Sequence, residues 1–155
     1  MKRTIKQVRN IEKIEKELKN NYVGTLALQV DDDKFEQISA PFLYKDKNIF
    51  LFFIHNDELY NDIQFDTSVS FTILRTVKLR KTKKAGFNPT YHFYSTKISG
   101  LIRKVDDPRT IDELRKSYAE KYSARSNKNA IDFKMVEKIA VIDTEEINAI
   151  EEIGG

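Results

Sequence analysis

The sequence predicts an α+β fold that is mainly antiparallel β-sheet with a few helices. Alternating or continuously apolar segments of strand length follow one another through most of the chain. Short polar turns separate them, and the regular strand–helix alternation typical of a parallel sheet is absent. We therefore expect six strands, two substantial helices and one short helix. A small closed or half-open barrel with helices at its rim accommodates these elements best.

The composition is that of one globular domain covering residues 1–155. Apolar residues make up 40% of the chain and charged residues 33%, which is enough to bury a core without covalent cross-links. Cysteine is absent, so disulfides and thiolate chemistry are excluded. The 27 basic and 24 acidic residues are too balanced to indicate nucleic-acid binding. The longest apolar run, residues 49–54, is too short for a membrane span, so we expect a cytoplasmic protein without a membrane partner.

The N-terminal third predicts one helix and two strands. A helix at residues 4–19 is indicated by apolar residues that recur every three or four positions: Ile5, Val8, Ile11, Ile14 and Leu18. Strands are expected at residues 22–30 and 35–44, joined by an aspartate-rich turn. Gly24 indicates a bend or a close approach, and Pro41 indicates an edge, a bulge or a change of strand partner.

The central part continues with strands at residues 49–54, 67–75 and 91–105, with a short helix around Leu59 and Ile63. Gly100 indicates a bulge or a sharp bend in the long strand. Asp107 followed by Pro108 is a strong helix start, and this helix should run to about Ser123.

The C-terminal part predicts the sixth strand and an ambiguous tail. One strand face is shared by Phe133, Met135, Ile139 and Val141, interrupted only by Glu137. The last twelve residues fit either a final helical turn or a frayed end.

Few residues carry recognisable chemistry. The two histidines, His55 and His92, lack the spacing of a metal site, and no nucleotide-binding or nucleophile motif is present. His92 fits a polar position on an alternating strand. His55 follows a buried strand directly, which suits either a ligand contact or a helix start capped by Asn56 or Asp57. No catalytic residue can be identified.

A basic cluster follows the fourth strand: Arg75, Lys78, Arg80, Lys81, Lys83 and Lys84. Its simpler interpretation, which we favour, is a solvated and mobile connection between two strands. The alternative is an anion clamp, most naturally for a phosphate, because several cationic groups can converge from one loop.

Several segments, taken in order, resemble one known superfamily. They are YVGTLAL, SAPFLYKDKNIFLFFI, NDELYNDI leading into DTSVSFTIL, and KISGLIRKVDDP. Their order and spacing resemble the FMN-binding split-barrel superfamily, the pyridoxamine phosphate oxidase-like proteins, in a small uncharacterised bacterial branch. The resemblance runs from about residue 11 to residue 143. It implies a six-stranded antiparallel split β-barrel with an N-terminal helix and a second helix after strand 5.

The resemblance also implies a homodimer with two FMN sites in the clefts between its subunits. In such proteins the flavin ring lies along strand backbone near the PFLY segment. A Thr or Ser at the end of the next strand and a Lys or Arg in the short helix usually hold the phosphate. This chain has Ile54-His55-Asn56 and Leu59 or Tyr60 at those places, so neither phosphate ligand is matched. The FMN-binding residues expected from this carry-over, with Lys97 and Ser99 added from strand alternation, are Pro41, Phe42, Leu43, His55, Asn56, Tyr60, Lys97 and Ser99.

The expected function is therefore that of a flavin-dependent oxidoreductase acting on a small molecule. Because the flavin carries the chemistry, the absence of a catalytic triad does not count against this hypothesis. The alternative is a non-enzymatic binding module on the same barrel that has lost the FMN site and holds haem or another planar anion. A dimeric scaffold without a small ligand is the third hypothesis.

Overall fold

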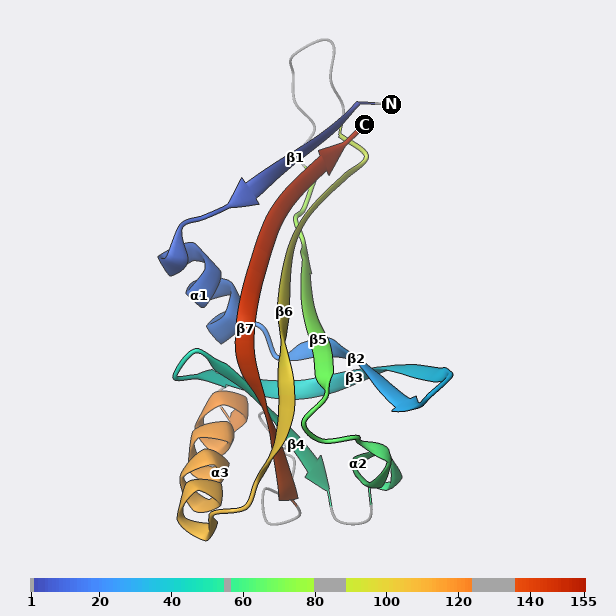
Figure 1. Ribbon diagram of the computed structural model, residues 1–155. Helices are drawn as coiled ribbons and strands as arrows, with labels where there is room; N and C mark the ends of the chain where they lie inside the picture. Colours follow the sequence, from blue (N-terminus) through green and yellow to red (C-terminus); the bar gives the residue numbers. More distant parts are fainter. Residues whose placement is uncertain (1, 55–56, 80–88, 124–135) are drawn as a thin grey trace.

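The computed structural model describes residues 2–54, 57–79, 89–123 and 136–155 (Figure 1). Every strand pairing in this part of the chain is antiparallel, which confirms the predicted fold class. The elements, in chain order, are β1 (Arg3–Val8), α1 (Ile11–Asn20), β2 (Val23–Asp31), β3 (Lys34–Lys45), β4 (Asn48–Ile54), α2 (Glu58–Asp62), β5 (Ser68–Thr76), β6 (Tyr91–Val105), α3 (Pro108–Ser123) and β7 (Val136–Gly154).

Six of the strands close into a ring. The sheet order is β1-β7-β4-β3-β2-β5-β6, and β6 also pairs with β7, so the ring runs from β7 through β4, β3, β2, β5 and β6 back to β7. These six correspond to the six predicted strands. β1 is additional and pairs with the C-terminal part of β7, beyond the segment that pairs with β4.

The predicted helix at residues 4–19 is wrong in its first half. Residues 3–8 form β1, and α1 begins only after Asn10, whose side chain accepts hydrogen bonds from the backbone N–H groups of Glu12 (3.0 Å) and Lys13 (3.2 Å). The apolar stripe is therefore not one face, since Ile5 and Ile11 are exposed and only Ile14 and Leu18 are buried. A strand forms here because these residues find a partner in β7 at the other end of the chain.

Both interpretations of the tail are also wrong, because β7 continues without a break to Gly154. Its backbone groups pair with β6 on one side and with β1 on the other. A segment with a partner on each side has no reason to fray. Of the residues assigned to the sixth strand, Phe133 and Met135 lie outside the described residues.

The irregular points of the strands are where the sequence places them. Pro41 is the last β3 residue paired with β2, and Phe42 begins the pairing with β4, so β3 changes partner there. A register shift lies between Ser99 and Gly100 in the β6–β7 ladder. A Cβ at Gly100 would lie 2.0 Å from the carbonyl oxygen of Asp143, so only glycine fits.

Apolar side chains fill the ring and the space beneath α3. The interior cluster is built around fully buried residues such as Leu26, Phe42, Phe71 and Ile98, and Ile14 and Leu18 of α1 join it. A second cluster lies outside the ring, where α3 covers the sheet. It contains Leu43, Phe52, Leu114, Tyr118 and Ile139.

The C-terminal end of α3 is anchored on the backbone of Phe42. The Tyr122 hydroxyl accepts a hydrogen bond from Phe42 N (2.9 Å) and lies within donating reach of the carbonyl oxygens of Phe42 (3.0 Å) and Tyr22. Lys121 donates from Nζ to the same Phe42 carbonyl (3.0 Å) and lies 3.9 Å from the centre of the Phe42 ring. Burial lowers the pKa of Lys121 to about 8 and raises the pKa of Tyr122 to about 12.

Stability should rise with pH through the range in which Lys121 loses its proton. The pKa of Lys121 is about 8 in the folded state and 10.5 without burial, so between these values the unfolded chain binds more protons. The raised pKa of Tyr122 has the opposite effect above pH 10. Because Lys121 is only partly buried, we expect the free energy of unfolding in urea to rise by about 1–2 kcal/mol between pH 8 and pH 10 in the wild type. Lys121→Met should abolish the rise, whereas Lys116→Met, an exposed position of α3, should keep it. Equal slopes in the two variants would contradict this assignment.

Gly24 should tolerate no larger residue. A Cβ there would lie 2.2 Å from the ring of Phe71, which is fully buried and cannot move aside. Gly24→Ala should therefore lower the free energy of unfolding by about 1–3 kcal/mol. Denaturant unfolding would measure the loss, with Thr25→Ala at the neighbouring exposed position as the control. A Gly24→Ala protein as stable as the control would show that the Phe71 ring can repack.

Candidate functional site

The three predicted ligand residues of β3 lie in different surroundings. Phe42 points into the ring interior and is fully buried. Leu43 points the other way and is covered by α3 in the second apolar cluster. Pro41, which pairs with Val23, is half-buried on the outside of the ring. The Phe42 and Leu43 side chains belong to the core, and Tyr122 and Lys121 of α3 occupy the backbone N–H and carbonyl of Phe42.

Tyr60, the predicted residue on the short helix, is packed among aromatic rings. Asp57 caps α2 by accepting a hydrogen bond from Leu59 N (3.0 Å). The Tyr60 ring lies 5.2 Å from that of Phe53 and 5.5 Å from that of Phe65, and Lys138 Nζ lies 4.8 Å from its centre. Burial raises its pKa, with a smaller contribution from Asp106. The predicted contacts His55 and Asn56 lie outside the described residues.

Lys97 and Ser99 lie on the outer face of β6. Lys97 pairs across the strands with Thr72 of β5, and Thr72 pairs in turn with Thr25 of β2. Their chain neighbours Ile98, Phe71 and Leu26 point inward and are fully buried. An open groove of about 540 Å³ runs over this outer face, lined mainly by small side chains. Its lining residues are Val23, Gly24, Thr25, Ala27, Gln37, Ser70, Thr72, Leu74 and Lys97.

The same outer face exposes large apolar side chains. Val23 and Leu74 border the groove and are 56% and 59% exposed. Phe35, two positions before Gln37 on β3, is 74% exposed, and Ile5 of β1 is 49% exposed. By strand alternation and register, all four lie on this side of the sheet. Val23 and Leu74, which both line the groove, are the pair of exposed apolar residues that a binding partner would cover there.

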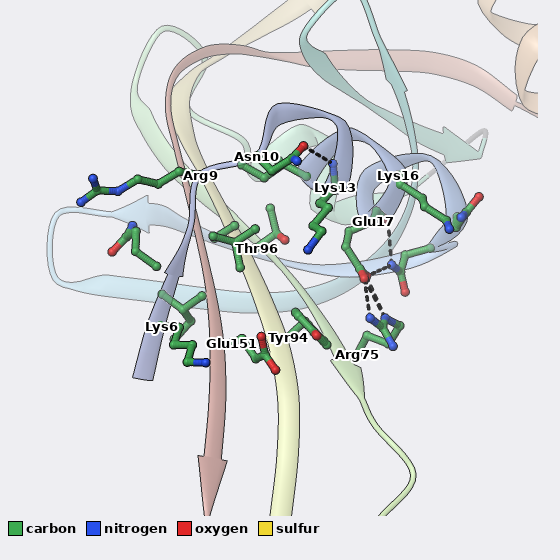
Figure 2. A pocket seen from close by; sticks show the side chains of 17 residues that line it. Lys6, Arg9, Asn10, Lys13, Lys16, Glu17, Arg75, Tyr94, Thr96 and Glu151 are labelled. Carbon is green, nitrogen blue, oxygen red and sulfur yellow. Dashed lines mark hydrogen bonds and ion pairs between the residues drawn. The ribbon is translucent and has the colours of Figure 1, made fainter. Parts of the chain in front are cut away.

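A second cavity lies on the opposite face of β5, β6 and β7, beneath α1 (Figure 2). Its volume is about 670 Å³. One side is a row of residues aligned across four strands: Lys6, Glu151, Tyr94 and Arg75. The adjacent row includes Val8, Ala149 and Thr96, and α1 forms the other side with residues such as Lys13 and Glu17. Of the predicted FMN-binding residues that the structure describes, none lines this cavity, whereas Arg75 of the predicted basic cluster does.

The two carboxylates in this cavity are already paired. Arg75 holds Glu17 through Nη2 (2.6 Å) and Nε (2.8 and 2.9 Å), and its guanidinium lies 4.6 Å from the Tyr94 ring centre. Glu151 lies 2.9 Å from Nε2 of His92. Burial raises the pKa of Tyr94, and the hydrogen-bonded Glu151 carboxylate raises it further.

The basic cluster after β5 is only partly described. Arg75 belongs to β5 and to the cavity beneath α1, where it is fixed by Glu17. Residues 80–84 lie outside the described residues, so the phosphate clamp and the solvated connection both stay predictions for that segment.

Two further expectations concern metals and membranes. In the described ranges no group of three or more His, Asp or Glu side chains is arranged to hold a metal ion. No helix within those ranges is long and apolar enough to cross a membrane.

Sequence comparison gives no match to a protein-family model and none to a curated protein. Comparison of structures gives close matches over nearly the whole chain. An FAD-binding protein from Mycobacterium smegmatis superposes with a TM-score of 0.65 at 12% identity, covering 95% of this chain and 98% of the other. A provisional pyridoxamine 5′-phosphate oxidase from Corynebacterium glutamicum gives 0.62 at 15% identity, covering 100% and 98%. This chain has the split-barrel fold.

A third neighbour extends the range of cofactors found on this fold. An FAD- and haem-binding protein from Mycobacterium smegmatis superposes with a TM-score of 0.70 at 9% identity, covering 96% of this chain and 73% of the other. The resemblance to the split-barrel superfamily is thus confirmed at the level of the fold. At identities this low the side chains of a site are not carried over with the fold, so the function must be argued from this chain's own residues.

Proposed function

We propose that this chain binds a flavin in the groove on the outer face of β2, β5 and β6. The main support for this proposal is the groove itself, whose wall consists mostly of small side chains and contains a single lysine. An FAD-binding protein from Mycobacterium smegmatis has the same fold. Thr25, Ala27 and Thr72 leave the sheet surface low enough for a planar ring to lie against it. The volume of about 540 Å³ lies within the range of roughly 300–1,000 Å³ that small-molecule sites occupy.

Lys97 supplies the positive charge of this site. It is exposed on the groove, and no ion pair engages it within the described ranges. A free ammonium group suits a flavin phosphate or the electron-rich edge of a reduced ring. The two phosphate ligands that the superfamily usually has are absent from the sequence, which gives Lys97 greater weight.

The site is completed by a second copy of the chain. One copy offers an open surface, whereas a bound ring has to be covered on both faces to be held firmly. Val23 and Leu74 flank the groove and would be buried by a partner placed over it. A homodimer would therefore remove exposed apolar surface and enclose the flavin in one step.

With a flavin bound, the protein would be an oxidoreductase acting on a small molecule, since the flavin supplies hydride or electron transfer. The chain's own residues would bind and orient the ring and exclude water from one side. The second candidate is a binding module for haem or another planar anion, which is favoured by the FAD- and haem-binding neighbour. Absorption spectra with flavin and with haemin distinguish the two.

Flavin titration tests the proposed site. Purified protein should bind FMN or FAD, seen as quenching of flavin fluorescence and a change in the visible spectrum. Because a charge-assisted contact contributes about 1.5–3 kcal/mol, Lys97→Ala should weaken FMN at least about tenfold and riboflavin much less. The melting temperature should not change, because Lys97 is exposed. Lys116→Ala on α3 is the control and should bind FMN like the wild type. Equal FMN affinity in the wild type, Lys97→Ala and Lys116→Ala would show that Lys97 does not contact the flavin. The absence of flavin binding in the wild type would overturn the proposed function.

The dimer is tested by its mass in solution. Light scattering should report about 36 kDa, twice the 18.1 kDa of one chain. Val23→Glu/Leu74→Glu should yield the single-chain mass, because two charges would be buried unpaired in the interface. Ile11→Glu, at a 65% exposed apolar residue of α1, should remain a dimer. A wild-type mass of 18 kDa at micromolar concentration would contradict the proposal.

A further inference from the structure

The cavity beneath α1 has an excess of positive charge. Its lining includes five cationic side chains and two carboxylates. Glu17 forms an ion pair with Arg75, and Glu151 lies within hydrogen-bond distance of His92 Nε2. The remaining cations, Lys6, Arg9, Lys13 and Lys16, form no ion pair with any residue that the structure describes.

Two of these four cations, Lys6 and Lys13, face the cavity from different elements. Lys13 extends from α1 toward Thr96 and Tyr94 on the strands, whereas Arg9 points away from the cavity (Figure 2). Lys6 enters from β1 in the same row as Tyr94, and Arg75 closes that row from β5. Lys13 of α1, Lys6 of β1 and Arg75 of β5 thus face the same space. Charged residues that serve only to keep a surface solvated do not need to lie together in this way.

The cavity offers more than charge. Val8, Ile14 and Ala149 give it an apolar floor, and Thr96, only 3% exposed, lies among them with a hydroxyl group. The volume of about 670 Å³ exceeds the need of a bare inorganic ion and suits a small organic molecule. An anionic head with a compact carbon body matches both parts of the lining.

We propose that this cavity binds a small phosphate monoester, at a site separate from the flavin groove. A phosphate dianion carries two negative charges, which the unpaired ammonium groups of Lys6 and Lys13 match, whereas a carboxylate carries one. The separation follows from the strand itself, because Thr96 faces the cavity and the next residue, Lys97, faces the groove. The inference therefore does not depend on the proposed function.

Phenyl phosphate is a suitable probe because it combines the phosphate with a compact apolar ring. Calorimetric titration at low salt should show saturable binding to the wild type, no measurable binding of phenol, and weakening as salt is raised. Lys6→Gln/Lys13→Gln should weaken phenyl phosphate at least tenfold. Lys19→Gln is the matched control, since it removes the same charge from α1 at a residue that does not line the cavity, and it should bind like the wild type.

These titrations distinguish a failure of the phosphate site from a failure of the flavin site. Absence of saturable binding up to about 10 mM, a free energy weaker than about −3 kcal/mol, would overturn the inference, as would equal weakening by Lys19→Gln. The single variants Lys6→Gln and Lys13→Gln serve if the double variant does not fold, and each should weaken the probe. FMN is titrated in parallel, and its affinity should be unchanged in the double variant. Loss of FMN binding there, with normal binding in Lys97→Ala, would show that the cavity holds the flavin phosphate and would overturn the separate site while retaining flavin binding.

Discussion

The pairing of β6 with β7 is the interaction on which the rest of the molecule depends. It joins Tyr91–Val105 to the C-terminal strand, closes the ring and fixes which side each residue of β6 faces. The partners of Ser99 and Gly100 are Glu146 and Thr144, so β7 has one extra residue there, Glu145, and its alternation changes at this point. Before the bulge Ala149 pairs with the inward-facing Thr96, and after it Ile142 pairs with the inward-facing Ile102. The extra residue of β7, next to the close approach that Gly100 allows, thus places Ile142 in the barrel interior and Ala149 at the cavity beneath α1.

The sequence predicted the features that have a local cause. Pro41 cannot donate a ladder hydrogen bond, Gly100 alone fits against the Asp143 carbonyl, and Asp107 accepts from Thr110 N (3.0 Å) at the start of α3. Lys97 and Ser99 were placed by strand alternation, and both lie on the outer face of β6. Each of these predictions depends only on residues close in sequence, so it does not require knowledge of which distant segments pair with each other.

The features that were missed depend on residues far apart in the chain. A 3.6-residue periodicity at Ile5 and Val8 suggested a helix, yet β7 captures this segment as a strand, with Lys6 opposite Glu151. No local signal fixes that register. Residues 3–8 show no strand alternation, because their two apolar residues, Ile5 and Val8, are three positions apart, as in a helix. The cavity beneath α1 was missed for the same reason, because its row of residues comes from both ends and the middle of the chain.

The two faces of the β1–β7 pair differ in how their charges are paired, and this difference makes the cavity beneath α1 suitable for an anion. On one face Glu152, 6% exposed, accepts from Arg3 Nε (2.6 Å) and Tyr91 (3.0 Å), so its charge is balanced by its strand neighbours. On the other face Glu151 has the same kinds of neighbour, Lys6 and Tyr94, but its partners are His92 and Tyr94. No ion pair in the described structure joins it to Lys6. Lys6 and Lys13 are exposed and keep their hydration without a partner, but both are free of ion pairs in the described structure. An anion that enters this space would therefore meet two ammonium groups that no carboxylate of the chain already holds.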